Sequence, residues 1–409
     1  MLPTDPRTER LIEAGTPAFW RAIAALIVGA ICTCSIMYAV QPILPVFART
    51  FHVSPATSSL ALSDTLAVIA VGLLAAGLLS DIRGRVSIMR WSVLASALIT
   101  MVTALAPSWP WLLAARAVVA LALCGFPAAA MAYIGEEFTP GAGALAMGLY
   151  VAGTAAGGML GRIATGILTD LWSWRVALGL LGSASLASGL AFSWLLPSSR
   201  RFTPHAPAVS DLLHTVRRQA SDPGLLALFG IGFVLLGTYM SIFNYVEFRL
   251  VEAPYRLNTS ALGLLYVINL GGMASSAWAG HLAGRKGPQT VLWLMLCVMV
   301  GGIVVTLAHP LWLIIAGLIV MSSGFLGAHT IVAAWVGRRA GHAKAIAASL
   351  YLFAFYTGAG ILGTLAGLVW TAGGWLAIVG ATCAVLLLAI GLAVSMQPLS
   401  ADSVAETTA

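Results

Sequence analysis

GLLSDIRGR, residues 77–85, places three charged side chains directly after more than twenty almost uncharged residues. A similar stretch, GHLAGRKG, occupies residues 280–287. The first glycines of the two stretches, Gly77 and Gly280, are 203 positions apart, and two later glycines repeat this spacing. Two copies of one charged loop at a fixed separation indicate that the chain is an internal duplication.

The composition is typical of a membrane protein. Of the 409 residues, 60% are hydrophobic and only 9% are charged, whereas soluble domains carry about 25% charged residues. The five cysteines lie in apolar runs without zinc-ligand spacing, so we expect neither disulfides nor a metal site. The net charge of +7 is scattered over several short loops, which argues against a nucleic-acid partner.

Twelve apolar runs have the length that crosses a membrane. About 20 helical residues span a hydrocarbon core of about 30 Å, and backbone groups in lipid must hydrogen-bond within their own segment. The expected fold class is therefore an all-α integral membrane protein with twelve transmembrane helices. The runs cover approximately 20–47, 56–79, 87–106, 110–134, 143–169, 175–196, 224–249, 259–281, 289–308, 311–336, 345–370 and 375–396.

The longest polar interruption divides the chain into two halves. It predicts an N-terminal six-helix bundle over 1–196, a cytoplasmic linker over 197–222 and a C-terminal six-helix bundle over 223–409. The offset of 203 residues also places Gln41 opposite Asn244. Parallel repeats of this kind, related by a pseudo-twofold axis along the membrane normal, are typical of transporters that bind substrate between two halves.

The distribution of basic residues predicts the orientation. With the N-terminus in the cytoplasm, fifteen of the 21 lysines and arginines fall on the cytoplasmic side, and only Arg49, Arg175, Arg249 and Arg256 lie on the other side. This imbalance satisfies the positive-inside rule. The polar first nineteen residues and the absence of a cleavage site argue against a signal peptide. We therefore expect a multi-pass protein of the cell inner membrane with both termini cytoplasmic.

With its duplicated loop and its twelve predicted spans, the chain resembles the major facilitator superfamily, in particular its twelve-helix drug:proton antiporter branch and the sugar-efflux-like bacterial permeases. The fourth-helix arginine of the family corresponds to Arg116, and its glycine-rich fifth helix is approximated by residues 148–162. Two residues depart from the antiporter pattern, because Gly158 stands where the family has proline and Arg162 where it has a small residue. The family loop signature Gly-x-x-x-Asp-x-x-Gly-Arg is matched by Gly77, Asp81, Gly84 and Arg85.

The signature loop has two interpretations. Asp81 can lie against the positive N-terminal end of the eleventh helix, which starts near Lys344, and act as a conformational latch. Gly77 and Gly84 would then allow a close helix approach and a tight turn. Alternatively, the charges of the loop only fix its topology and solvation.

Ionisable residues within the membrane are costly and suggest function. Asp64, Arg116 and Arg162 lie at a similar depth, roughly 10 Å below the outer surface. Asp64 can form a permanent ion pair with one of the arginines, or it can carry a proton, because burial raises the pKa of a carboxylate. Two arginines against one clear acid favour an anionic or zwitterionic substrate. The resemblance places the helices with these residues around the cavity, with Tyr38, Gln41, Asn244, Tyr245 and Tyr356 as further candidates for substrate binding.

Two more residues are candidates for proton coupling. Glu247 is near the outer end of the seventh helix, where exposure to solvent is the expected alternative. His329 in the tenth helix can relay protons, although a single histidine in a helix is more often a hydrogen-bonded packing residue.

These observations predict a secondary active transporter of a small organic solute, with proton-coupled efflux by alternating access. An uncoupled facilitator and a proton-coupled importer are the alternatives. A membrane enzyme is disfavoured because the helices carry no catalytic motif, and a receptor is disfavoured because no loop exceeds about 26 residues. No nucleotide-binding loop is present. We expect no cofactor and a monomer in the lipid bilayer.

Overall fold

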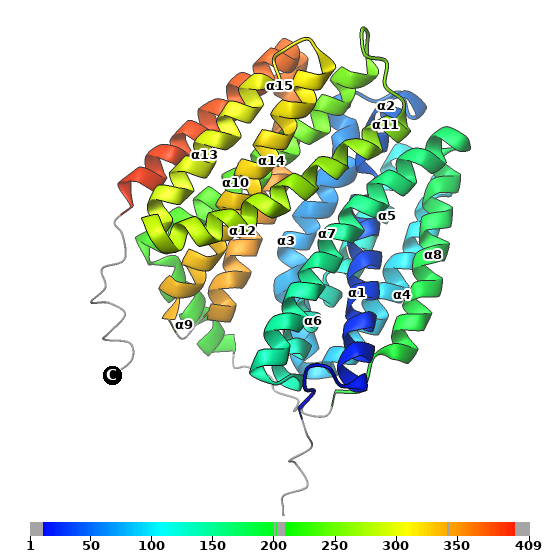
Figure 1. The fold of residues 1–409 in the computed structure, drawn as a ribbon. Coiled ribbons are helices and arrows are strands. Elements are labelled where there is room, and N and C mark those ends of the chain that lie inside the picture. Colours follow the sequence, from blue (N-terminus) through cyan, green and yellow to red (C-terminus); the bar gives the residue numbers. More distant parts are fainter. Residues whose placement is uncertain (1–10, 200–201, 203–208, 342–343, 397–409) are drawn as a thin grey trace, which may run out of the picture. The chain divides into compact units, whose positions relative to one another are not determined.

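The computed structural model describes residues 11–199, 202, 209–341 and 344–396. The described chain is helical, as the apolar runs predict, and Figure 1 shows the order of its elements. The helices of the first half are α1 (Pro17–Tyr38), α2 (Leu44–Thr50), α3 (Pro55–Arg83), α4 (Arg85–Thr103), α5 (Trp109–Leu123), α6 (Gly125–Glu137), α7 (Pro140–Leu171) and α8 (Trp174–Leu195). Those that follow are α9 (Val209–Ala220), α10 (Pro223–Val251), α11 (Thr259–Leu264), α12 (Asn269–Lys286), α13 (Pro288–Val305), α14 (Leu311–Arg339) and α15 (Lys344–Ser395).

Eleven segments of the described chain are long and apolar enough to cross a membrane. The last of them, within α15, covers two predicted spans. Non-helical backbone at Gly373 and Gly374 divides it. Gly374 has φ +59°, a conformation that glycine adopts without the steric penalty of a Cβ atom. The glycine pair therefore separates the eleventh and twelfth spans, as the sequence predicts, and the all-α fold with twelve membrane helices is confirmed.

Three of the predicted spans contain interruptions that hydrophobicity alone does not reveal. The fourth is divided at Cys124 between α5 and α6. The first span breaks after Tyr38, continues as the 3₁₀ helix η1 (Gln41–Ile43) and resumes as α2. Pro42 and Pro45 lack the N–H group that would continue an α-helix. The eighth span is similarly divided into α11, η2 (Leu265–Ile268) and α12.

The described chain divides into two compact units. The first contains the described residues of Met1–Val46, Val71–Pro207 and Asn258–Leu264. The second contains those of Phe47–Ala70, Ala208–Leu257 and Leu265–Ala409. Each unit therefore includes a short segment from the other half of the sequence. The linker prediction for 197–222 falls partly on residues 200–201 and 203–208, which are outside the described chain, and the boundaries 1–196 and 223–409 stay predictions.

The duplication is visible in the backbone of the two charged loops. Gly84 precedes α4 with φ 95° and ψ 140°, and Gly287 precedes α13 with φ 83° and ψ 148°. Residues with a Cβ atom rarely adopt this conformation. The tight turn expected at Gly84 is therefore confirmed, and its counterpart repeats it.

A second correspondence lies where α4 and α13 end. In the first unit, Arg175 donates from Nη2 to the carbonyl oxygen of Ala106 over 2.7 Å. In the second unit, Arg249 donates from Nη2 to the carbonyl oxygen of Ala308 over 2.8 Å. Cations are favourable at the C-terminal ends of helices because the last carbonyl groups carry partial negative charge. Two of the arginines on the predicted outer side therefore donate hydrogen bonds to carbonyl groups that follow the ends of helices.

In the first unit α7 lies directly against α1 (Figure 1). A Cβ atom on Gly161 would lie 2.5 Å from the backbone oxygen of Ser35, and one on Gly157 would lie 2.6 Å from that of Ile31. The hydroxyl of Ser35 donates to the carbonyl oxygen of Gly157 over 2.9 Å. Small residues permit this close helix approach, which brings the end of α1 beside Arg162.

Candidate substrate site and signature loop

The guanidinium of Arg162 is held at the break in the first span. Its Nε donates to Gln41 Oε1 over 2.9 Å, and its Nη1 donates to the carbonyl oxygen of Gly158 over 2.8 Å. The ring of Tyr38 lies 4.1 Å from Cζ, which is a cation–π distance. Arg162 is only 5% exposed. These contacts fix the orientation of the guanidinium.

The break in the first span explains why three predicted residues meet here. Tyr38 is the last residue of α1 and Gln41 is the first of η1, so both lie where the helical hydrogen-bond pattern changes. Gln41 is fully buried. The structure thus brings Tyr38, Gln41 and Arg162 together within the first unit, and their role in substrate binding stays a prediction.

Arg116 is used differently. Its Nη1 donates to the carbonyl oxygen of Ile36 over 3.2 Å, and its Nη2 donates to that of Met37 over 2.9 Å. These carbonyl groups lie in the last turn of α1, where the helix leaves acceptors unsatisfied. Arg116 is 1% exposed. These contacts assign it a structural role at the end of α1, and its predicted contact with substrate stays untested.

Most of the remaining candidates lie in the second unit. The hydroxyl of Tyr245 donates to Ser59 Oγ over 3.2 Å, and Asn244 is fully buried on the same helix. Ser59 and Asp64 are on the part of α3 that belongs to this unit. The structure therefore groups Asp64 with α10 and α15, whereas Arg116 and Arg162 belong to the first unit.

The expectation that Glu247 is exposed to solvent is wrong. Glu247 is fully buried, and the hydroxyl of Tyr266 donates to its Oε1 over 2.6 Å. Tyr266 belongs to η2, 19 positions from Glu247 in the sequence. Helical periodicity places Glu247 near the end of an apolar run but does not reveal that another helix covers it.

His329 lies in an aromatic cluster of the second unit. Its Nδ1 is 2.7 Å from the hydroxyl of Tyr351, and its ring centroid is 4.6 Å from that of Phe355. The ring of Tyr356 meets Phe355 edge-on with centroids 5.8 Å apart. A hydrogen-bonded histidine among stacked rings fits the packing alternative, and neither proton relay nor substrate contact is tested by these distances.

The same cluster contains residues that the sequence reasoning did not select. Tyr239 stacks on Phe325 with centroids 4.2 Å apart and approaches Phe243 at 4.6 Å. The Tyr239 hydroxyl donates to Asn269 Oδ1 over 2.8 Å. Aromatic residues within apolar runs give no signal of their own, because rings packed in a core and rings lining a cavity have the same spacing along a helix.

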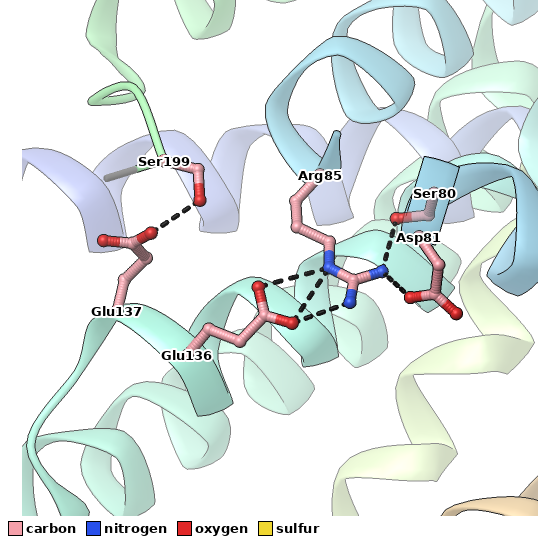
Figure 2. Close-up of polar contacts among 6 residues, drawn as sticks. All are labelled: Ser80, Asp81, Arg85, Glu136, Glu137 and Ser199. Atoms are coloured by element: carbon pink, nitrogen blue, oxygen red, sulfur yellow. Dashed lines mark hydrogen bonds and ion pairs between the residues drawn. The ribbon is translucent and has the colours of Figure 1, made fainter. Parts of the chain in front are cut away.

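The signature loop forms an ion-pair cluster within the first unit, shown in Figure 2. Arg85 donates from Nη2 to Glu136 Oε1 over 2.6 Å and from Nη1 to Ser80 Oγ over 3.1 Å. The same Nη1 pairs with Asp81 on the preceding turn of α3. Glu136, near the end of α6, was not selected from the sequence because its partner is 51 positions away. The predicted contact of Asp81 with the start of α15 at Lys344 stays a prediction.

The first residues of the predicted linker lie beside this cluster. Ser199 donates to Glu137 Oε1 over 2.5 Å (Figure 2). The ring of Phe202 lies 5.7 Å from Cζ of Arg85. At Gly77, in contrast, a Cβ atom would meet nothing within 4 Å, and the close helix approach expected at this position stays a prediction.

Comparison with known proteins gives consistent matches. The family model described as Major Facilitator Superfamily matches residues 26–363. The chain is 41% identical to the inner membrane transport protein YnfM of Escherichia coli over 378 residues, covering 92% of this chain and 90% of that protein. It is 39% identical to the uncharacterized MFS-type transporter YybF of Bacillus subtilis over 381 residues, covering 93% and 94%.

Solved structures share the fold at low sequence identity. A bacterial homolog of the human lysosomal transporter Spinster, in an inward-facing and occupied conformation, matches with a TM-score of 0.77 at 17% identity, covering 93% of this chain and 97% of that one. The human organic anion transporter MFSD10 matches with a TM-score of 0.68 at 16% identity, covering 92% and 100%.

Proposed function

Because this chain belongs to the major facilitator superfamily and is a membrane transporter, we propose that it exports a small organic anion or zwitterion in exchange for protons. The observation that carries this proposal is the arrangement of Arg162. A buried guanidinium oriented by Gln41, Gly158 and Tyr38 is suited to gripping a planar anionic group.

The cost of burial supports a role for this residue. An arginine at membrane depth costs about 2.5–3.5 kcal/mol on the insertion scale, and Arg162 stands where the family usually has a small residue. The contacts with Gln41, Gly158 and Tyr38 position the side chain, and a fixed, planar guanidinium suits a carboxylate or phosphate ligand.

Proton coupling requires a carboxyl group that changes its charge during the cycle. Asp64 is partly buried in the membrane-spanning part of α3, and Glu247 is buried beside the hydroxyl of Tyr266. Both are candidates for carrying the proton, because desolvation favours the neutral form of a carboxyl group. We favour Asp64, and Asp64→Asn tests this choice, because it removes the change of charge, retains the size of the side chain and should uncouple transport from the pH gradient.

The test uses purified protein in liposomes with an imposed pH gradient. A panel of amphipathic carboxylates, quaternary amines and neutral sugars is screened for uptake, and the best solute is then measured with Arg162→Lys. Replacing the planar fork by a point charge should raise KM about tenfold or more, while kcat changes less. Arg175→Lys is the matched control, because that arginine contacts a carbonyl group in an outer loop.

The outcomes separate the parts of the proposal. Full-affinity transport by a folded Arg162→Lys protein would eliminate the substrate role of this residue. Transport of quaternary amines but not of carboxylates would overturn the assignment of substrate charge. A rate of solute transport that does not depend on the imposed pH gradient would favour an uncoupled facilitator.

A further inference from the structure

A carboxylate at the end of α7 contacts the beginning of α11. Asp170 Oδ1 accepts a hydrogen bond from the backbone N–H of Thr259 over 3.1 Å, and Oδ2 accepts one from the backbone N–H of Ser260 over 2.7 Å. The Thr259 hydroxyl donates to Asp170 Oδ1 as well. Asp170 is 89 positions from Thr259 in the sequence. This contact therefore ties the end of the fifth span to the start of the eighth.

The contact completes the hydrogen bonding of this helix end. The first N–H groups of a helix have no partner within the helix. Asn258 accepts a hydrogen bond from the N–H of Ala261 over 3.0 Å with its own side chain, and the N–H of Leu262 donates to the carbonyl oxygen of Asn258 over 3.1 Å. The two remaining groups, on Thr259 and Ser260, are satisfied by Asp170. Separation of α11 from α7 would leave both of them to water.

Glycines allow the two helices to approach closely at this point. A Cβ atom on Gly263 would lie 2.7 Å from the carbonyl oxygen of Arg162, and one on Gly166 would overlap the backbone of Thr259. The Thr259 hydroxyl also lies 3.0 Å from the carbonyl oxygen of Gly166. The close contact thus extends over two turns of α7, from Arg162 to Asp170. It includes the backbone of Arg162, the candidate substrate-binding residue.

The segment ends where the span changes both its conformation and its unit. Asn258–Leu264 belongs to the first unit, whereas the chain from Leu265 onward belongs to the second. Leu265 is also the first residue of η2, which separates α11 from α12. The 3₁₀ geometry is weaker than that of an α-helix and often marks a hinge. The beginning of the eighth span, α11, is therefore attached to α7, and this attached segment ends where the 3₁₀ helix η2 begins.

We infer that Asp170 is a gating residue of transport, whose carboxylate keeps the outer end of the eighth span on α7 and is released when the outer side opens. The outer side is the one that the positive-inside rule assigns to this loop. In this role the charge and reach of the carboxylate determine how often the segment leaves α7. The inference rests on transport by this chain and does not depend on the charge of the substrate.

The test measures opening from outside in intact cells. Leu262, which is fully buried, is replaced by cysteine as a reporter, and a membrane-impermeant maleimide is added. Peptide mass spectrometry quantifies labelling at this position, so the native cysteines stay in place. Glu252→Cys, in an exposed outer loop, is the reporter that should label equally in every variant.

Asp170→Asn is expected to increase the labelling rate of the Leu262→Cys reporter by about 2- to 30-fold, the factor that corresponds to losing a helix cap. Thr259→Val, which retains the side-chain shape and removes the hydroxyl, should also increase labelling. It should add less in the Asp170→Asn background, because the two changes remove one shared contact. Asn258→Ala is the matched control, since it removes a cap of the same helix without touching α7.

Unchanged labelling in Asp170→Asn would overturn the inference. An equal increase in Asn258→Ala would also overturn it, because fraying of the helix end would then explain the result. If Asp170→Asn does not reach the membrane, the labelling rates of Thr259→Val and Asn258→Ala are compared instead. A larger increase in Thr259→Val supports the inference, and equal rates overturn it. The assay needs no substrate, so its outcome is independent of the proposed solute and of proton coupling.

Discussion

Replacing Gly161 by alanine tests the link between the packing of α7 and the position of Arg162. The new Cβ atom would lie 2.5 Å from both Cα and the carbonyl oxygen of Ser35 and 2.8 Å from its carbonyl carbon. All three are backbone atoms of α1, so a change of side-chain rotamer cannot relieve the clash. The helices must therefore separate by several tenths of an ångström or more along this contact.

The expected size of the effect follows from two opposing contributions. Overpacking of a tight contact typically costs about 1–3 kcal/mol. Alanine recovers about 1 kcal/mol relative to glycine within a helix. We therefore expect a net loss of up to about 2 kcal/mol in the free energy of unfolding. The displacement also moves Arg162 relative to Gln41, so the affinity for substrate should fall together with the stability.

The same helix offers a control. A Cβ atom on Gly148 would meet nothing within 4 Å, so Gly148→Ala should gain the helix propensity without a clash. Thermal unfolding of the two detergent-solubilised variants, followed by tryptophan fluorescence, provides the comparison. The reasoning is refuted if Gly161→Ala is as stable as Gly148→Ala and has the affinity of the unchanged protein.

Two further changes test the site and the loop. Gln41→Leu removes the acceptor of the Arg162 Nε bond, and leaving a buried donor unsatisfied should cost about 1–3 kcal/mol of stability; an unchanged melting temperature would show that this bond is not needed. Gly84→Ala places a Cβ atom on a residue with φ 95° and ψ 140° and should cost about 1–3 kcal/mol. Gly77→Ala should be neutral or slightly stabilising, and equal melting temperatures would contradict the assigned backbone strain.

The fold could be predicted in detail because its main determinant is local. A run of apolar residues long enough to cross the bilayer must become a helix, whatever its neighbours are. The boundary between the last two predicted runs, 345–370 and 375–396, likewise coincides with the non-helical backbone at Gly373 and Gly374. The break after Tyr38 was not predicted, because the prolines that cause it lie within an uninterrupted apolar run.

The site was less predictable because its contacts join distant parts of the chain. Arg162 was selected as a costly charge, but its contact with Gln41 spans 121 positions and depends on how α7 packs against α1. Glu247 is buried and accepts a hydrogen bond from Tyr266, which lies on another span. Glu136 and Asp170 stand near helix ends, where single charges are common and do not suggest a partner.

The arginines at the ends of α4 and α13 reveal how the duplicated halves have diverged. Ala106 and Ala308 occupy corresponding positions, yet their arginines come from different places. The arginine that donates to Ala106 comes from α8, three spans after α4, and the one that donates to Ala308 comes from α10, two spans before α13. An alignment of the halves would place these arginines against unrelated residues. The two halves thus satisfy corresponding carbonyl groups with arginines from positions that do not correspond, so the equivalence of the two copies lies in the carbonyl groups that need a partner rather than in the residues that provide one.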